Sequence, residues 1–362
     1  VNNRGVIRCH KDVGLVSHVF NQEILDGMPG SMAIGHVRYS TTGNQSRENA
    51  QPIAITHVKG NLAVAHNGNL VNAGELRRKI ELNGGIFRSS NDTEVLVYTI
   101  VNERLKCGSI EQAVVNAMGI IEGAYSLVVM SPRKLIAARD PHGFRPLCIG
   151  RLDESYVFAS ETCALDALGA EFIRDVEPGE VCVVENGELR SLHCGIQCPS
   201  SACVFEYIYF ARPDSVIDGA SVELARQEAG KYLSIEHPVG ADVVIGVPDS
   251  GIPAAIGYAK FSGIPYGVGL IKNRYIARTF IQPGQDKRER SVRLKLNALR
   301  TAVEGKRVIM VDDSIVRGTT CARLVKLLRD AGAAEVHMRI SAPPFRHPCF
   351  FGTDIPERSQ LL

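Results

Sequence analysis

Two adjacent carboxylates end an apolar run in VIMVDDSIVRGTT, residues 308–320. Asp312 and Asp313 follow four apolar residues of the kind that form a buried strand. After them, Gly318 and several hydroxyl residues precede a helical pattern, so that backbone N–H groups and hydroxyls can form an anion site. Carboxylates beside such a site would repel a bare phosphate. They suit a site in which sugar hydroxyls or Mg²⁺ lie next to the phosphate.

A second turn of this kind follows the apolar run in VVIGVPDSGIPAA. Asp249 and Ser250 there could meet a diphosphate and Mg²⁺, although the turn alone is equally typical of a plain helix start. Between the two turns, residues 272–307 hold eleven Lys and Arg against three Asp and Glu. Nucleic acid and a solvated face are alternatives, but without a stacking aromatic cluster we favour a polyphosphate substrate under a flexible lid around IQPGQ. The candidate cations are Lys272, Arg274 and Arg278.

Three polar segments of the first half, GHVRYST, AHNGNLVN and SSNDTE, carry groups that could bind a free amino acid. Arg38 could clamp its carboxylate through two parallel hydrogen bonds, and Asp92 could pair with its ammonium. Asn67 and Gly68 could donate hydrogen bonds to an oxyanion. Each has an ordinary alternative: a surface charge for Arg38, a hairpin turn for HNGN and a helix cap for Asp92.

The elements expected to position these groups differ between the two halves of the chain. Up to about residue 190, β-type runs separated by turns surround two helical patterns, at 73–84 and 92–106, the second starting on Asp92 as N-cap. This order predicts an α+β domain with a mostly antiparallel sheet. The expected strands are AIGHVRYST, NLAVAHNGNLV, AYSLVVMS, KLIAARD, YVFASE and EVCVVENGELRSL.

Strands and helices alternate in the second half, which is typical of a parallel, doubly wound sheet. Helices are expected at 222–236, 252–263 and 319–333, and strands at 241–251, 306–314 and 335–344. Ligands of such a sheet bind beyond the carboxyl ends of its strands, where both acidic turns lie. We place the junction in QCPSSACVFEYIYFARPDS, which gives domains 1–198 and 199–362.

Bulk composition restricts the classes of protein that fit. The chain has 362 residues, 45% apolar and 22% charged, with net charge +2, as in a globular protein of about two domains. No apolar run approaches the ~20 residues of a membrane span, and no secretory signal opens the chain. Ten scattered cysteines without a CxxC pair argue against a disulfide scaffold or a self-contained zinc site. We therefore expect reduced thiols and a cytoplasmic enzyme.

VIMVDDSIVRGTT closely resembles the 5-phosphoribosyl-1-pyrophosphate (PRPP) motif of the type I phosphoribosyltransferases. The three polar segments of the first half resemble the glutamine-binding segments of class II glutamine amidotransferases. With EYIYFARPDS and KNRYIARTFIQP, the pattern resembles the glutamine PRPP amidotransferase family over nearly the whole chain. This implies an α+β domain like the N-terminal-nucleophile hydrolases, followed by an α/β phosphoribosyltransferase domain with a parallel sheet.

The reaction implied by the resemblance opens de novo purine synthesis. Glutamine is hydrolysed, and its ammonia displaces pyrophosphate from C1 of PRPP to give 5-phosphoribosylamine. Asp312 and Asp313 would hold ribose hydroxyls or Mg²⁺, while Asp249 and Ser250 would meet pyrophosphate and Mg²⁺. The loop for the 5′-phosphate would comprise Ser314, Ile315, Val316, Arg317, Gly318, Thr319 and Thr320. Purine nucleotide inhibitors and a homo-oligomer are implied as well.

Both ends of the chain depart from the family pattern. The family's glutaminase nucleophile is an N-terminal cysteine, whereas this chain begins with Val1, and Cys9 falls well past the family's start. We therefore expect a truncated chain that uses free ammonia instead of glutamine. One branch of the family carries a [4Fe–4S] cluster; Cys203 and Cys349 match two of its four ligands, and the others would lie beyond Leu362. Buried free thiols are the alternative.

Three other functions compete with this interpretation. A salvage phosphoribosyltransferase would explain the second half but not the set Arg38, Asn67 and Asp92. A PRPP-binding regulator would carry a DNA-binding module, and none is visible, so we expect no nucleic-acid partner. A degenerate scaffold without catalysis would require Val1 to be the natural start.

Overall fold

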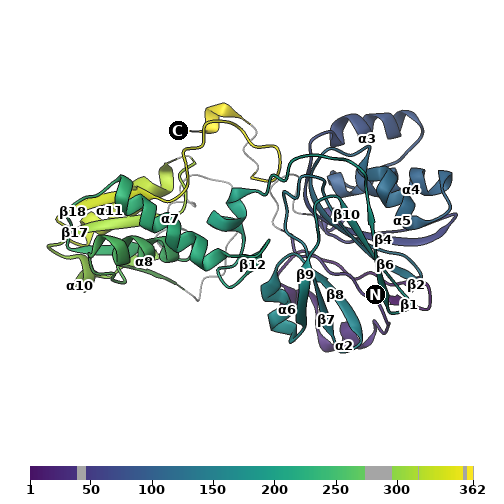
Figure 1. Ribbon diagram of the computed structural model, residues 1–362, viewed down its shortest axis with the longest axis horizontal. Helices are drawn as coiled ribbons and strands as arrows, with labels where there is room; N and C mark the ends of the chain where they lie inside the picture. The colour runs from purple at the N-terminus through teal and green to yellow at the C-terminus, as the bar shows by residue number, and fades with distance from the viewer. Residues whose placement is uncertain (39–45, 274–295, 317, 354–356, 362) are drawn as a thin grey trace. The chain divides into compact units, whose positions relative to one another are not determined.

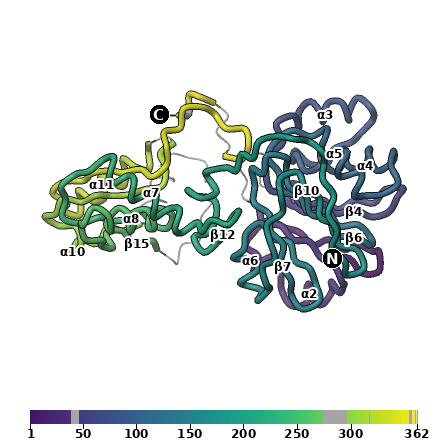
Figure 2. The backbone as a smooth tube through the Cα atoms, viewed as in Figure 1, coloured from purple at the N-terminus to yellow at the C-terminus, as the bar shows by residue number. Residues whose placement is uncertain are grey.

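The computed structural model describes residues 1–38, 46–273, 296–316, 318–353 and 357–361. The chain forms two compact units, which are described separately below. Unit 1 comprises Val1–Cys203 and Cys349–Pro356, and unit 2 comprises Val204–Pro348 and Glu357–Leu362. Cys349–Thr353, near the C-terminus, thus belongs to unit 1, and Figure 2 draws this part of the backbone in yellow.

The main sheet of unit 1 has six antiparallel strands in the order β11-β10-β6-β5-β4-β3. These strands are β3 (Ile53–His57), β4 (Gly60–Leu70), β5 (Gly123–Met130), β6 (Lys134–Arg139), β10 (Glu180–Glu185) and β11 (Glu188–His193). Because side chains alternate along a strand, Leu62 and Val64 lie on one face, where they join Leu96 and Ile100 of the helix layer in one core. The opposite face contributes Ala137 to a second core with the smaller sheet.

The helices of unit 1 and its smaller sheets complete the layers around the main sheet (Figure 1). The helices are α1 (Val16–Val19), α2 (Gln22–Asp26), α3 (Ala73–Leu82), α4 (Asp92–Lys106), α5 (Ile110–Met118), α6 (Thr162–Leu168) and the 3₁₀ turn η1 (Arg47–Asn49). A second sheet, in the order β8-β7-β9, is formed by β7 (Cys148–Leu152), β8 (Ser155–Ala159) and β9 (Glu171–Asp175). A two-stranded sheet is formed by β1 (Asn2–Asn3) and β2 (Val6–Ile7).

The central sheet of unit 2 is parallel, in the order β14-β17-β18. Its strands are β14 (Val243–Gly246), β17 (Arg307–Asp312) and β18 (Glu335–Ile340). The helices are α7 (Val222–Glu236), α8 (Gly251–Ser262), α10 (Arg300–Val303), α11 (Thr319–Asp330), the π-helix η2 (Glu206–Phe210) and the 3₁₀ turn η3 (Arg358–Gln360). Two small antiparallel pairs are β12 (Val216–Ile217) with β13 (Ala220–Ser221), and β15 (Leu270–Lys272) with β16 (Leu296–Ala298).

Helices cover both faces of this parallel sheet. Ile309 of β17 packs with Ala255 and Tyr258 of α8 in one core, whereas Met310 packs with Leu324 of α11 in another. Successive residues of β17 are therefore buried on opposite faces, which explains its continuous apolar run. Within the described residues, no helix is both long enough and apolar enough to cross a membrane.

The predicted architecture is confirmed: an α+β unit with an antiparallel main sheet precedes an α/β unit with a parallel sheet. Two local predictions were wrong. Residues 33–38 of the expected strand AIGHVRYST join no sheet, and its last three residues lie outside the described part. Helix α4 begins at Asp92, but its N-cap is Asn91, whose side chain accepts a hydrogen bond from the Thr93 amide.

Candidate functional site

The two acidic turns of unit 2 meet at the carboxyl edge of the parallel sheet. Strands β14 and β17 are neighbours in parallel register, with Val243 opposite Val308, so the turns that follow them are adjacent. The Ser250 hydroxyl donates a hydrogen bond to Asp313 Oδ2. From the other side, the Ser314 hydroxyl donates to Asp313 Oδ1 at 2.5 Å. The structure thus joins residues of both predicted turns in one polar cluster.

Asp312 and Asp313 form a buried pair of carboxyl groups, each only 7% exposed. The Asp313 amide donates to Asp312 Oδ1 at 2.9 Å. Burial, and then the charge of Asp313, raise the pKa of Asp312 to about 7. A cation, or hydroxyl donors from a sugar, would relieve this repulsion. With the Ser250 hydroxyl, the pair offers the hard oxygen ligands that Mg²⁺ prefers.

The predicted phosphate loop leads from these carboxyls into α11. Gly318, with φ of 68°, is the N-cap of that helix, a backbone conformation that glycine adopts without strain. Thr319 and Thr320 form its exposed first turn, and Ile315 and Val316 are half-buried before it. Arg317 lies outside the described residues.

Lys272, at the end of β15, forms an ion pair with Asp249 of the first turn. This contact places one of the predicted cations at the same edge as Ser250 and Asp313. Arg274 and Arg278 lie outside the described residues, as does the expected lid around IQPGQ.

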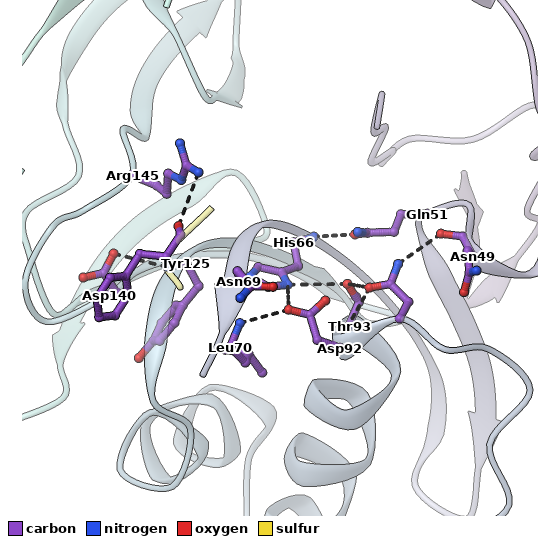
Figure 3. A network of polar contacts seen from close by, with 12 residues as sticks. Asn49, Gln51, His66, Asn69, Leu70, Asp92, Thr93, Tyr125, Asp140 and Arg145 are labelled. Atoms are coloured by element: carbon purple, nitrogen blue, oxygen red, sulfur yellow. Dashed lines mark hydrogen bonds and ion pairs between the residues drawn. The ribbon is translucent and has the colours of Figure 1, made fainter. Parts of the chain in front are cut away.

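The candidate amino-acid site of unit 1 lies where β4 ends beside the start of α4 (Figure 3). Asp92 Oδ2 accepts a hydrogen bond of 3.0 Å from the Leu70 amide and lies 3.7 Å from His66 Nδ1. Burial disfavours the charged form of Asp92, but His66 and the amides of Leu70 and Thr93 outweigh it, so the pKa of Asp92 is lowered. Asp92 is therefore an anchored carboxylate and not merely a helix cap.

Asn67 and Gly68 lie within β4, paired with Ser126 and Tyr125 of β5. The HNGN segment is thus part of a strand, and the alternative of a hairpin turn is wrong. Gly68 has φ of +146°, and a Cβ there would lie 1.9 Å from the Ala124 carbonyl oxygen. Only glycine fits this close approach of two strands.

Arg38 acts electrostatically on its neighbour His36. Burial, followed by the charges of His66 and Arg38, lowers the pKa of His36 to about 4. His36 therefore lies within electrostatic range of the buried His66, which lies beside Asp92. The role of Arg38 in the same site stays a prediction.

Several supporting residues were not predicted from the sequence. His66 is 3% exposed and its Nε2 atom has no hydrogen-bond partner in the described structure. Asn91 donates to the Asn49 carbonyl at 3.0 Å, and the His66 amide donates to Gln51 Oε1 at 2.7 Å. Only Asn91 had a local signal, because asparagine is a preferred N-cap; the other contacts join remote segments.

Cys203 is bonded to the turn that follows β6, and the segment that holds Cys349 packs on the same turn through Phe351. The Cys203 amide donates to the Phe144 carbonyl at 3.2 Å, and Phe351 stacks on Phe144 with ring centroids 4.8 Å apart. Burial disfavours the Cys349 thiolate, but the nearby polar groups of Thr353 and Phe351 outweigh it, so the pKa of Cys349 is lowered. Among the residues described, no group of three or more His, Cys, Asp or Glu could hold a metal ion.

Comparison with known proteins matches both units to known domains. A glutamine amidotransferase domain matches residues 36–167, and a phosphoribosyl transferase domain matches residues 223–344. The chain is 52% identical to the amidophosphoribosyltransferase of Archaeoglobus fulgidus, covering 98% of this chain and 78% of the relative. For the enzyme of Methanocaldococcus jannaschii the identity is 49%, over 98% of this chain and 79% of the relative.

Solved structures agree with these matches. The glutamine PRPP amidotransferase of B. subtilis, complexed with ADP and GMP, superposes with a TM-score of 0.91 at 50% identity, covering 100% of this chain and 78% of its own. A structure described as the allosteric regulatory enzyme of purine biosynthesis gives 0.89 at 51% identity, covering 96% and 75%. Fold and site thus define a glutamine amidotransferase joined to a phosphoribosyltransferase. The chain belongs to the amidophosphoribosyltransferase family.

Proposed function

We propose that this chain serves the amidophosphoribosyltransferase reaction, in which glutamine, PRPP and water give 5-phosphoribosylamine, glutamate and pyrophosphate, and that with free ammonia in place of glutamine it catalyses the transferase half. The observation that carries the proposal is the junction of the two acidic turns of unit 2 through Ser250 and Asp313. A salvage phosphoribosyltransferase would not need the second site, where Asp92 is held beside Asn67 and Gly68. Domains 1–198 and 199–362 would carry the two half-reactions.

In the transferase half, the protein mainly binds and orients PRPP. The loop from Ser314 to Thr320 would hold the 5′-phosphate through amides and hydroxyls at the start of α11. Asp312 and Asp313 would hold ribose hydroxyls or the metal. Asp249 and Lys272, paired in this structure, would separate to meet pyrophosphate and its metal. Fixed cations and loops would then stabilise the leaving group as C1 becomes oxocarbenium-like.

In the glutamine half, Arg38 would bind the α-carboxylate and Asp92 the α-ammonium of glutamine. The low pKa of Asp92 supports this role, because the carboxylate stays ionised at neutral pH. Asn67 and the amide of Gly68 would donate hydrogen bonds to the oxyanion formed at the side-chain amide.

Mg²⁺ fits the edge of unit 2, where Asp312, Asp313 and Ser250 would hold it. When bound there, Mg²⁺ would neutralise charge on the pyrophosphate. A [4Fe–4S] cluster fits less completely, because Cys203 and Cys349 would supply only two thiolates. Iron content and visible absorption of anaerobically purified chain, compared with its Cys349→Ser variant, test that assignment.

We also propose that purine nucleotides inhibit the chain, that it forms homo-oligomers and that it acts in the cytoplasm. The ADP and GMP in the similar B. subtilis structure support the first of these. Nucleotide binding measured by calorimetry and mass measured by light scattering test the first two.

The deciding experiment measures pyrophosphate release from PRPP and Mg²⁺ by a polypeptide of residues 1–362, with ammonium or glutamine as nitrogen donor. Release with ammonium supports the transferase site, and release with glutamine supports an intact glutaminase as well. An Asp312→Asn, Asp313→Asn variant should bind PRPP more weakly by at least about tenfold. If PRPP binds both proteins equally, or neither, the proposed transferase site is wrong.

A further inference from the structure

A segment near the end of the chain contributes to the candidate glutamine site of unit 1. Cys349–Thr353 lies outside both matched domains, which end at residues 167 and 344, yet it belongs to unit 1. Asn69 Nδ2 donates a hydrogen bond of 2.6 Å to the Phe350 carbonyl, across 281 positions of sequence. The next residue, Leu70, donates its amide to Asp92. One side chain thus connects this segment to the strand end that holds Asp92.

The other side of the segment is fixed by the turn after β6. The Phe351 carbonyl accepts a hydrogen bond of 3.4 Å from Arg145 Nη2, and the Phe351 ring stacks on Phe144 at an interplanar angle of 24°. Gly352 has φ of +132°, and a Cβ there would lie 1.8 Å from Arg145 Nη2. The guanidinium therefore lies directly against the backbone of Gly352, so a side chain there would push the end of Arg145 aside and would also be strained by the positive φ.

The turn after β6 is bonded to β5, the strand that pairs with Asn67 and Gly68 of β4. Asp140, with no exposed surface, accepts hydrogen bonds from the amides of Phe144, at 3.0 Å, and Tyr125, at 3.3 Å. Tyr125 pairs with Gly68 across β5 and β4. Figure 3 shows Asn69 and Leu70 between Tyr125 and Asp92. The contacts therefore form a closed ring that includes the candidate oxyanion residues.

We propose that Cys349–Thr353 is a brace for the glutamine site and that Asn69 is the positioning residue that connects the two. The inference rests on the proposed glutamine site at Asn67, Gly68 and Asp92. Because Asn69 and Leu70 are adjacent, a shift of the brace moves the amide that orients Asp92. Coupling between two sites is reciprocal, so bound glutamine also orders the brace.

Two variants interrupt the ring at different points. Asn69→Asp keeps the shape of the side chain but replaces the donor with a carboxylate that repels the Phe350 carbonyl. Gly352→Ala displaces the brace without touching Asn69. The matched control is Asn83→Asp, because Asn83 Nδ2 makes the same type of bond, at 2.8 Å to the Lys79 carbonyl, on an exposed part of unit 1.

Calorimetric titration should show a dissociation constant for L-glutamine that is about tenfold larger in Asn69→Asp and Gly352→Ala. It should be unchanged in Asn83→Asp. Pyrophosphate release with ammonium should be the same in all four proteins. Amide hydrogen exchange distinguishes a positioning residue from a purely structural one, because replacing a purely structural residue would not change the effect of glutamine on exchange. L-glutamine should slow exchange in peptides spanning 349–353 in the unmodified chain and in Asn83→Asp, but not in Asn69→Asp.

The exchange measurement on the unmodified chain decides the proposal even where a variant fails to fold. If L-glutamine binds this chain, and Asp92→Asn abolishes that binding, but exchange at 349–353 is unaffected, the brace is wrong and the glutamine site stands. If L-glutamine does not bind the unmodified chain, the proposed glutamine site fails, and the brace fails with it. If L-glutamine still slows exchange at 349–353 in the Asn69→Asp variant, Asn69 does not connect the brace to the glutamine site.

Discussion

The Ser250 hydroxyl donates a hydrogen bond to the Asp313 carboxylate, although 63 positions separate the two residues. Ser250 precedes α8, and Asp313 follows β17. The bond exists because β14 and β17 are parallel neighbours, so the turns after them share one edge. The turn after β17 supplies the carboxyl pair and the Ser314 hydroxyl, and the turn after β14 supplies Ser250, so the two are joined only when the sheet forms.

Ser250→Ala should weaken Mg²⁺-dependent activity, because it removes both a proposed oxygen ligand and the donor that orients Asp313. We expect the Mg²⁺ concentration at half-maximal pyrophosphate release to rise about tenfold with ammonium as donor. Ser262→Ala is the matched control, since the Ser262 hydroxyl lies at the other end of α8, where it donates to the Ala259 carbonyl and accepts from the Ile264 amide. Equal Mg²⁺ dependence of both variants would exclude a metal-binding role for Ser250.

Asp312 should make the metal-free protein less stable as pH rises. In the folded state it keeps its proton up to about pH 7, whereas an unperturbed aspartate loses it near pH ~4. Between these values the folded state binds more protons than the unfolded state, so the free energy of unfolding falls with pH, by at most about 1.4 kcal/mol per unit.

Asp312→Asn removes this titration but keeps an oxygen acceptor for the Asp313 amide. In urea unfolding between about pH 5 and about pH 7, the variant should therefore lose less stability than the parent chain. Added Mg²⁺ should stabilise the parent chain more than the variant, because it binds the ionised pair. Parallel pH curves for the two proteins would refute the raised pKa of Asp312.

The titration of His36 should change the free energy of unfolding with pH in the direction opposite to that of Asp312. Its pKa is about 4 in the folded protein, because of burial and then the charges of His66 and Arg38, against ~6.5 in the unfolded chain. The unfolded state therefore binds more protons between these values, and the contribution of His36 to stability is lost as pH falls through them. An NMR titration of its ring should show a midpoint well below the ordinary value. A midpoint near ~6.5 would mean that His36 lies in solvent, away from His66.

Much of unit 2 could be predicted from the sequence because its signals are local. The apolar run of β17, its terminal carboxyls and Gly318 before α11 all lie within one short stretch. The 36–38 segment could not be predicted in the same way. Its alternation of apolar and polar residues is typical of a strand, yet residues 33–38 join no sheet, because ladder partners depend on tertiary packing and not on propensity.

The contacts that complete the glutamine site left no pattern in the sequence. Asn69 and Phe350 are 281 positions apart, and Asn49 and Asn91 are 42 apart. Side-chain bonds to backbone carbonyls require no particular residue type at the acceptor. The sequence therefore predicts candidate substrate-binding groups, but not the residues that hold those groups in place.

Helices α7 and α8 approach each other at two glycines, which makes their packing sensitive to a single methyl group. A Cβ on Gly257 would lie 2.0 Å from the Gln227 carbonyl oxygen, and one on Gly230 would lie 1.9 Å from that of Ala254. Backbone atoms cannot yield as a flexible side chain can, so the helices would have to separate. Because α8 begins directly after Ser250, this movement would also displace the turn that we propose meets pyrophosphate.

Gly257→Ala should therefore lower the free energy of unfolding by about 1–3 kcal/mol and reduce PRPP binding. The matched control is Gly74→Ala in the exposed first turn of α3, where a Cβ would meet nothing within 4 Å. There the gain in helix propensity should stabilise the chain by up to about 1 kcal/mol. The same chemical change should thus have opposite signs in the two helices, as measured by urea unfolding. A Gly257→Ala variant as stable as the parent chain would show that α7 and α8 are not in backbone contact.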